Sequence, residues 1–183
     1  MPLGIPQGPL RAPRSNMMAF VMHGFIDELA HAAGADPVAF RLDLLGEAEV
    51  VQQGASTYGA GRMRACLQAV AERSGWARRA ELPRRTGMGV AFQYSHRGYF
   101  AEVVQVTVSN AGIPKVDKVW VVGDVDSQIV NPLGAINQVQ GSVIDGLSVA
   151  LFQKITIENG AVVEGNFNTY RLIMWNFTKI MRF

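Results

Sequence analysis

The hydrophobic positions of the N-terminal third follow the period of an α-helix. After an irregular, proline-rich opening, apolar residues recur three and four positions apart from Asn16 onward. They are Met18, Val21, Met22, Phe25 and Leu29. This spacing predicts a helix with one apolar face, closed by Gly34.

Two shorter helices are predicted next. Asp36-Pro37 has the composition of an N-cap followed by a first helical turn, and Gly46 marks the end of that helix. Residues 47–61 show no periodicity and are expected to be linker-like. A third helix covers residues 62–75, with Leu67, Val70 and Ala71 facing inward.

The period changes to two in the second half of the chain. Val104, Val106 and Val108 alternate with their neighbours, as in a half-buried strand, and residues 116–122 return as its partner. A helix is expected over residues 131–152. Beyond it, the segment ITIENGAVVEG predicts a second hairpin that turns at Asn159-Gly160.

The element order predicts an α+β fold in which helices pack on an antiparallel sheet. One domain is expected over residues 1–183. It comprises a loop plus two helices in 1–46, a helix at 62–75, and a hairpin–helix–hairpin in 86–183.

Composition narrows the function classes. With 17 basic and 15 acidic residues, the net charge of +2 gives no support for nucleic-acid binding, and an arginine cluster at 78–85 is expected to be a solvated loop. The single cysteine, Cys66, excludes an internal disulfide and a four-cysteine metal site, and its helical setting favours packing. No apolar run is long enough to span a membrane, and the N-terminus lacks the apolar core of a signal peptide.

The helix predicted over 131–152 has an unusual face. It carries three interior glycines, each of which costs roughly 1 kcal/mol relative to alanine. Gly134, Gln138, Gly141, Asp145 and Ser148 share one side, opposite an apolar face of Leu133, Ile136, Val143, Leu147 and Leu151. The glycines leave room either for a packed helix or strand, or for a flat polar ligand beside the Gln138 amide. The pattern leaves both interpretations open.

Other candidates have ordinary explanations. His23 and Asp27, four apart on a helix, favour a surface hydrogen-bonded pair over two metal ligands. Asp124 and Asp126 follow a strand and favour a turn cap over a cation site. Arg11, in a proline-rich loop, suits either solvent or an anion. Residue chemistry alone yields no catalytic set and no metal site.

Two segments together resemble one family. The first is GPLRAPRSNMMAFVMHGFIDELAHAAGADPVAFRLDLL, and the second is VWVVGDVDSQIVNPLGAINQVQGSVIDGLSVALFQKITIENGAVVEGNFNTY. Both resemble molybdenum-binding segments of the xanthine oxidase family of molybdenum hydroxylases, in the same order. The short gap between them is similar to the isoquinoline 1-oxidoreductase β-subunit type, and the resemblance extends to about Tyr170.

The resemblance implies a cofactor and a reaction. The large subunit of that family holds molybdopterin, usually as the cytosine dinucleotide in bacteria. It hydroxylates aldehydes or N-heterocycles with oxygen from water, and it passes electrons to [2Fe–2S] clusters on a separate small subunit.

The resemblance also implies site residues. Leu10, Arg11 and Ala12 would lie against the cofactor. Pro13 would stand where some members place an aromatic residue that stacks on substrate. Gln138, the first residue of a Gln-x-Glu-Gly motif, would bond near the molybdenum centre, and Gly141 would give clearance.

Three departures from the family pattern qualify the expectation. The Glu of the Gln-x-Glu-Gly motif is Gln140, and a Glu of the first helix is His23. The Gly-x-Gly-Glu motif, whose Glu is the general base, would lie beyond Phe183. No catalytic residue is therefore assigned within this chain, and the isolated chain is expected to be inactive. The closing LIMWNFTKIMRF also departs from the family pattern.

Partners and compartment follow from the same resemblance. The expected partners are the rest of the large subunit and a [2Fe–2S] subunit, with no nucleic acid and no membrane span. The alternative is a catalytically inactive truncated module that folds and self-associates as a homo-oligomer without cofactor. The chain as written would be cytoplasmic, and a full-length parent could be periplasmic.

Overall fold

The computed structural model describes residues 4, 8–13, 15–173 and 181–182. Their contacts form two compact units. The sheet unit comprises the described residues of 17–128 and 180–183, and the α4 unit comprises those of 1–16 and 129–179. That residues 1–183 form one domain stays a prediction. The predicted α+β class is confirmed within the described residues.

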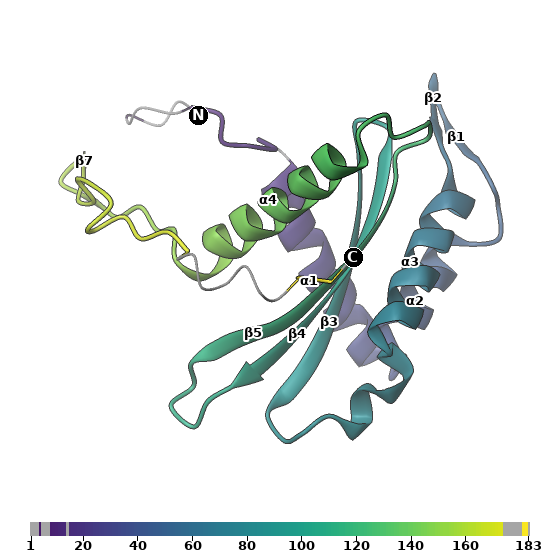
Figure 1. The fold of residues 1–183 in the computed structure, drawn as a ribbon, viewed down its shortest axis with the longest axis horizontal. Helices are drawn as coiled ribbons and strands as arrows, with labels where there is room; N and C mark the ends of the chain where they lie inside the picture. The colour runs from purple at the N-terminus through teal and green to yellow at the C-terminus, as the bar shows by residue number, and fades with distance from the viewer. Residues whose placement is uncertain (1–3, 5–7, 14, 174–180, 183) are drawn as a thin grey trace. The chain divides into compact units, whose positions relative to one another are not determined.

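A four-stranded sheet organises the sheet unit (Figure 1). Strands β3 (Thr86–Ser95), β4 (Gly98–Val108) and β5 (Pro114–Asp124) are antiparallel, and β8 (Met181–Arg182) adds to β5 in parallel. The predicted return of the chain after Val108 is therefore confirmed. A bulge between Gln105 and Val106 shifts the β4–β5 register and adds local twist.

Local sequence signals set the ends of the helices that cover one face of this sheet. In α2 (Pro37–Leu45), the Asp36 carboxylate accepts hydrogen bonds from the Val38 and Ala39 amides, and Gly46 ends the helix at φ 63°. Helix α3 (Ala60–Ser74) ends at Gly75 in the left-handed conformation, which glycine adopts without a Cβ penalty. A 3₁₀ helix, η1 (Trp76–Glu81), follows.

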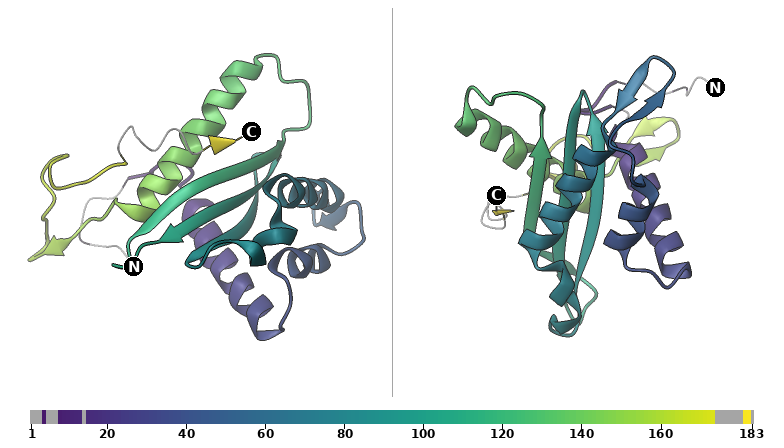
Figure 2. Two further views of the ribbon diagram at one scale, coloured as in Figure 1. Left: turned by 60° about the horizontal axis from the view of Figure 1, so that its bottom comes forward. Right: turned by 90° about the vertical axis from the view of Figure 1, so that its right-hand side faces the viewer.

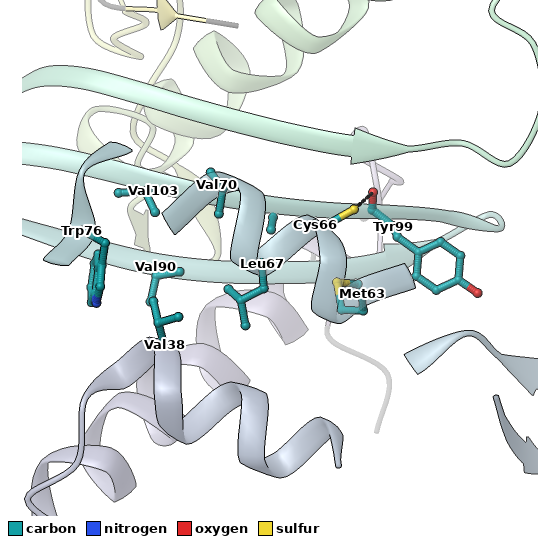
Figure 3. Close-up of a cluster of buried hydrophobic side chains, with 10 residues drawn as sticks. Val38, Met63, Cys66, Leu67, Val70, Trp76, Val90, Tyr99 and Val103 are labelled. Atoms are coloured by element: carbon teal, nitrogen blue, oxygen red, sulfur yellow. Dashed lines mark hydrogen bonds between the residues drawn. The ribbon is translucent and has the colours of Figure 1, made fainter. Parts of the chain in front are cut away.

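The core lies between α3, α2 and the sheet (Figure 3). Leu67 and Val70 of α3 are fully buried and Ala71 packs beside them, as the helical spacing predicts. Val103 contributes from β4 and Val38 from α2. Cys66 is buried in the same cluster, where its thiol donates to the Tyr99 carbonyl at 3.7 Å. The predicted packing role of the cysteine is confirmed.

The sequence pattern missed the short hairpin before α3. Strands β1 (Val51–Gln53) and β2 (Ser56–Tyr58) pair antiparallel within the stretch that was predicted to be linker-like. The prediction was wrong because three-residue strands are too short to establish a period of two. The Tyr58 ring packs against Tyr94 and Tyr99 of the β3–β4 hairpin, which ties β2 to the main sheet.

Helix α1 (Ser15–Ala32) forms where the pattern predicts, but its apolar face is not buried. Met18, Val21, Met22, Phe25 and Leu29 are 40–56% exposed. The buried side of the helix instead carries His23 and Ala30. Hydrophobic spacing therefore identified the helix and its apolar face, and the structure leaves that face exposed.

His23 contacts the edge strand of the sheet at Phe92. Its Nε2 bonds the Phe92 carbonyl, and the Phe92 amide lies 3.4 Å from the same nitrogen. Strand β3 is an edge strand, and Nε2 can satisfy one of these two backbone groups at a time, donating to the carbonyl when it carries the proton. Burial lowers the pKa of His23, which favours the neutral ring. The predicted surface pair with Asp27 was wrong.

Asp27 pairs instead with a fully buried arginine that sequence reasoning did not single out. Arg41 of α2 is 0% exposed, and its Nη1 lies 2.8 Å from Asp27 Oδ1. The same side chain donates to the carbonyls of Pro37 and His23 at 3.1 and 3.3 Å. These contacts join α1 to α2 through one desolvated cation.

The α4 unit is built on one long helix. Helix α4 (Pro132–Leu151) begins where predicted, with Asn131 Oδ1 accepting from the Gly134 amide at 2.9 Å. The hairpin of β6 (Ile157–Glu158) and β7 (Ala161–Val162) turns through Asn159 and Gly160, both at positive φ, which confirms the predicted turn. The apolar face of α4 is covered unevenly, since Val143 is buried and Leu133 is 74% exposed.

Figure 2 shows the helices and the sheet of this unit from two further directions. Helix α3 lies along the sheet, and α2 lies beside α3. Among the described residues, no helix is both long enough and apolar enough to cross a membrane.

Candidate functional site

The α4 unit brings the predicted cofactor loop to the glycine-bearing face of α4. The loop of residues 8–13 is irregular, with Ala12 at φ 56°. Two bonds from Asn16 hold it in place: its side-chain amide donates to the Arg11 carbonyl, and its backbone amide donates to the Ala12 carbonyl, each at 3.3 Å. The start of α1 therefore positions the Arg11 side chain.

Arg11 and Gln138 are direct partners. Arg11 Nη2 donates to Gln138 Oε1 at 3.1 Å, although 127 positions separate them in sequence. Arg11 Nη1 lies 3.9 Å from Asp145 Oδ2, one helical turn past Gly141. Both charged side chains are about half exposed, so this ion pair contributes little to stability. The geometry defines a cluster of Arg11, Gln138, Gly141 and Asp145, called the Arg11–Gln138 cluster below.

The three glycines of α4 have different surroundings. A Cβ on Gly134 would approach the Asn131 side chain to 2.9 Å, so the cap itself requires glycine there. A Cβ on Gly141 would meet only Arg11 Nη1, at 3.9 Å, and one on Gly146 would meet open space. Nothing in the described chain therefore requires glycine at 141 or 146, although both lie inside a helix.

The donors and acceptors of Arg11 and Gln138 suit ligand binding. The guanidinium carries five N–H donors in a planar fork that matches phosphate and carboxylate oxygens. The Gln138 amide offers both a donor and an acceptor. The two side chains together can therefore orient and hold a polar ligand.

The remaining predicted site residues are at the surface of the same loop. Leu10, Ala12 and Pro13 are exposed. They stay predictions, as do the roles of Arg11, Gln138 and Gly141. Gln140, which stands in place of the family glutamate, is half-buried on α4.

The aspartates after β5 form a turn clamped by arginine. The Asp126 amide donates to Asp124 Oδ1 at 3.0 Å, which is the favoured turn cap. Arg62 of α3 binds Asp124 through two bonds of 2.7 and 2.5 Å, and this pairing lowers the pKa of Asp124 to about 2. Among the described residues, no cluster of three His, Cys, Asp or Glu side chains could hold a metal ion.

One arginine of the cluster that was predicted to be solvated makes contacts within the fold. Arg79 lies 2.5 Å from Asp36 and stacks over the Trp76 ring at 4.6 Å from its centroid. The Trp76 indole donates to the same carboxylate at 2.9 Å. Asp36 thus caps α2 and fixes η1 at once, a role that the cap signal alone does not reveal.

Glu102 is a titratable residue that sequence reasoning missed. It lies on β4 between Ala91 of β3 and Val121 of β5, on the sheet face opposite the core. Its surroundings are apolar and no ion-pair partner is found for it within the described ranges, so burial raises its pKa to about 7. The alternation of β4 does show that Glu102 faces away from Val103, but the sequence does not show how apolar that side is.

Comparison with known proteins gives a consistent family. Residues 47–176 match the model of the molybdopterin cofactor-binding domain. The chain is 34% identical over 170 residues to a membrane-bound aldehyde dehydrogenase [pyrroloquinoline-quinone] of Gluconacetobacter polyoxogenes, a match that covers 89% of this chain and 22% of that protein. It is 30% identical over 156 residues to the beta subunit of isoquinoline 1-oxidoreductase from Brevundimonas diminuta, covering 84% and 18%.

A third relative has the same pattern of coverage. A nicotinate dehydrogenase subunit of Pseudomonas putida (strain KT2440) is 29% identical over 171 residues, covering 85% of this chain and 13% of that protein. The chain thus spans between about an eighth and about a fifth of the length of these relatives. No solved structure matches it.

The family match covers well over half of the chain and includes Gln138 and Gly141. The relatives extend the similarity across most of the remainder. These matches confirm the resemblance to molybdenum hydroxylase large subunits. The chain belongs to the molybdopterin cofactor-binding domain family.

Proposed function

We propose that this chain supplies one wall of a molybdopterin site, formed by Leu10, Arg11 and Ala12 from the loop and by Gln138 and Gly141 from α4. The observation that carries the proposal is the Arg11–Gln138 hydrogen bond, which joins two family-like motifs that are far apart in sequence. The cofactor is the cytosine dinucleotide form of molybdopterin.

The chemistry of the cluster fits such a ligand. A pterin dinucleotide presents phosphate oxygens together with ring donors and acceptors. Arg11 can bind oxyanions with the N–H groups that Gln138 does not use, and the Gln138 amide can bond ring or ligand atoms. Gly141 leaves the space above the α4 backbone open apart from Arg11 Nη1. When bound, the group supplies the redox chemistry, and these residues hold and orient it.

The substrate class proposed is aldehydes or electron-poor N-heterocycles. The names of the relatives include an aldehyde dehydrogenase, an isoquinoline oxidoreductase and a nicotinate dehydrogenase. One of these names specifies pyrroloquinoline quinone. We assign molybdopterin because the family model describes that cofactor and spans α4. Pro13 is the proposed substrate contact.

The chain would act together with partners. These are the rest of a large subunit and an electron-accepting [2Fe–2S] subunit. Since no catalytic residue is assigned within this chain, the isolated chain is proposed to bind rather than to turn over. The alternative function, an inactive module that self-associates without cofactor, is favoured by the exposed apolar side chains of α1 and α4.

Site variants test the assignment. Arg11→Ala and Gln138→Ala should each remove the gain in melting temperature that wild-type chain shows when it is purified from cells making the cofactor, relative to cells that lack it. Arg73→Ala, which changes an exposed arginine of α3, is the matched control and should keep the gain. If both site variants retain it in full, the assigned wall is wrong.

A further inference from the structure

Helix α1 is joined to β3 and α2 through polar groups. His23 bonds the Phe92 carbonyl of β3, and Asp27 pairs with Arg41 of α2 at 2.8 Å. Arg41 also donates to the His23 carbonyl at 3.3 Å. The buried side chains of the helix are His23 and Ala30, whereas its apolar face is about half exposed. Little apolar burial therefore holds α1 in place.

The enclosure of the His23 ring suits its neutral form. The residue is 9% exposed, and its ring lies edge-on to the Phe92 ring, with 4.9 Å between the centroids. Nε2 faces the Phe92 carbonyl, so it carries the proton of the neutral ring and donates. Nδ1 is buried and has no hydrogen-bond partner within the part of the chain that the structure describes. A second proton on Nδ1 would therefore be a buried donor without an acceptor, which is unfavourable.

The charges near the ring also act on a second proton. Burial has the largest effect and lowers the pKa of His23, and the bond to the Phe92 carbonyl opposes this shift. Arg41, which is fully buried on α2, lowers the pKa further, whereas Asp27 on the same helix raises it. Asp27 already pairs with the Arg41 guanidinium, which offsets its effect on the ring. From β3 the ring meets Phe92, which is uncharged.

Detaching α1 would return the His23 ring to water. A histidine in water has a pKa of about 6.5 and takes up a proton as the pH falls below that value. The docked ring resists the same proton, because its pKa is lowered. The stability that the neutral ring gives the docked helix is therefore complete above about pH 6.5, and it is lost as the pH falls from there toward the pKa of the docked ring.

We propose that His23 is an acid-released latch: its neutral ring holds α1 against β3 and α2, and its doubly protonated ring lets the helix detach while the sheet stays folded. Release of α1 requires less free energy than global unfolding, because the hydrophobic core is built from α2, α3 and the sheet. This inference goes beyond the proposed cofactor function and does not rest on it, since it uses neither Arg11 nor Gln138.

Hydrogen–deuterium exchange of the full chain between about pH 7 and pH 5 tests the latch. Each peptide is compared with its own intrinsic exchange rate at the same pH, which gives a protection factor. In wild-type chain, protection of peptides from α1 should fall by up to about tenfold per pH unit below about 6.5. Peptides from β4 report global unfolding, and their protection should not fall in parallel.

Two histidine variants separate the latch from other titrating groups. His23→Gln keeps an N–H that can donate to the Phe92 carbonyl but takes up no proton, so α1 protection should become independent of pH. His31→Gln is the matched control, because His31 is exposed on the same helix, and it should keep the wild-type dependence. Glu102 does not account for the expected loss, since acid favours its folded form.

Three results overturn the proposal. The first is a wild-type chain whose α1 peptides are unprotected at neutral pH or equally protected over the whole range. The second is a loss of protection that α1 and β4 share. The third is a His23→Gln chain that loses α1 protection in acid as wild type does. If His23→Gln fails to dock α1 at neutral pH, the wild-type comparison of α1 with β4 still decides.

Discussion

Replacing the two optional glycines of α4 with alanine should separate stability from binding. Gly141 and Gly146 both lie inside the helix, and neither is required by a close contact within the chain. Alanine is favoured over glycine in a helix interior by roughly 1 kcal/mol. Gly141→Ala and Gly146→Ala should therefore each raise the free energy of unfolding by about that amount.

The two variants should differ in cofactor binding. The Cβ added at Gly141 lies 3.9 Å from Arg11 Nη1, on the face proposed to meet the ligand, whereas the Cβ at Gly146 points into open space. Inserting a methyl group into a fitted contact costs about 1–3 kcal/mol. Gly141→Ala should thus weaken cofactor binding about tenfold to hundredfold, and Gly146→Ala should leave it unchanged.

Urea denaturation of the apo chain gives the stability, and retained cytidine monophosphate after gel filtration of the loaded chain gives the binding. Gly134→Ala provides an internal reference, because its Cβ would crowd the Asn131 cap and should give no gain in stability. The reasoning is refuted if Gly141→Ala and Gly146→Ala bind cofactor equally well. It is also refuted if the apo chain of either variant is less stable than wild type.

Two further predictions concern the sheet unit. Asp27→Ala should lower the free energy of unfolding by about 2–3 kcal/mol, because it leaves the buried Arg41 cation unpaired. Arg41→Met should lower it by less, because it removes the buried charge itself. Urea denaturation that gives the reverse order would contradict this. Burial raises the pKa of Glu102 to about 7 in the folded chain, whereas the unfolded-state pKa is about 4.3. The stability that the protonated Glu102 side chain contributes is therefore complete below about pH 4.3 and should be lost as pH rises through about 7. Glu102→Gln should therefore gain stability over wild type by up to about 3 kcal/mol between pH 4 and 8, and a pH-independent difference would refute it.

Features encoded by adjacent residues could be predicted from the sequence. The Asp36-Pro37 start of α2, the Gly75 end of α3 and the Asn159-Gly160 turn all depend on the conformational preferences and hydrogen bonds of neighbouring positions. These preferences act whatever else the chain packs against. The elements they bound therefore appear where the pattern put them.

What covers an apolar face could not always be predicted. The apolar positions of α1 have the spacing of a buried face, yet the helix buries His23 and Ala30 and leaves residues such as Phe25 exposed. Periodicity states which residues share a side, while the tertiary arrangement decides what covers that side. Arg41 illustrates the same limit, since its burial depends on Asp27 and on two carbonyls contributed by other parts of the fold.

The candidate site was predicted in a different way. Composition and spacing singled out the glycine face of α4 but left its occupant open, and family resemblance supplied Arg11 as its neighbour. Their proximity is a long-range contact between residues 127 positions apart, which no local pattern encodes. The structure places the two side chains in direct contact.

The central claim is that the chain contributes to binding molybdopterin cytosine dinucleotide through the Arg11–Gln138 cluster. The most direct measurement is molybdenum and released cytidine monophosphate per chain, on protein purified from cells that make the cofactor. The account predicts that wild-type chain retains both in a fixed ratio and that Arg11→Ala retains neither. Wild-type chain that carries no molybdenum and no nucleotide, or an Arg11→Ala chain that carries as much as wild type, would contradict it.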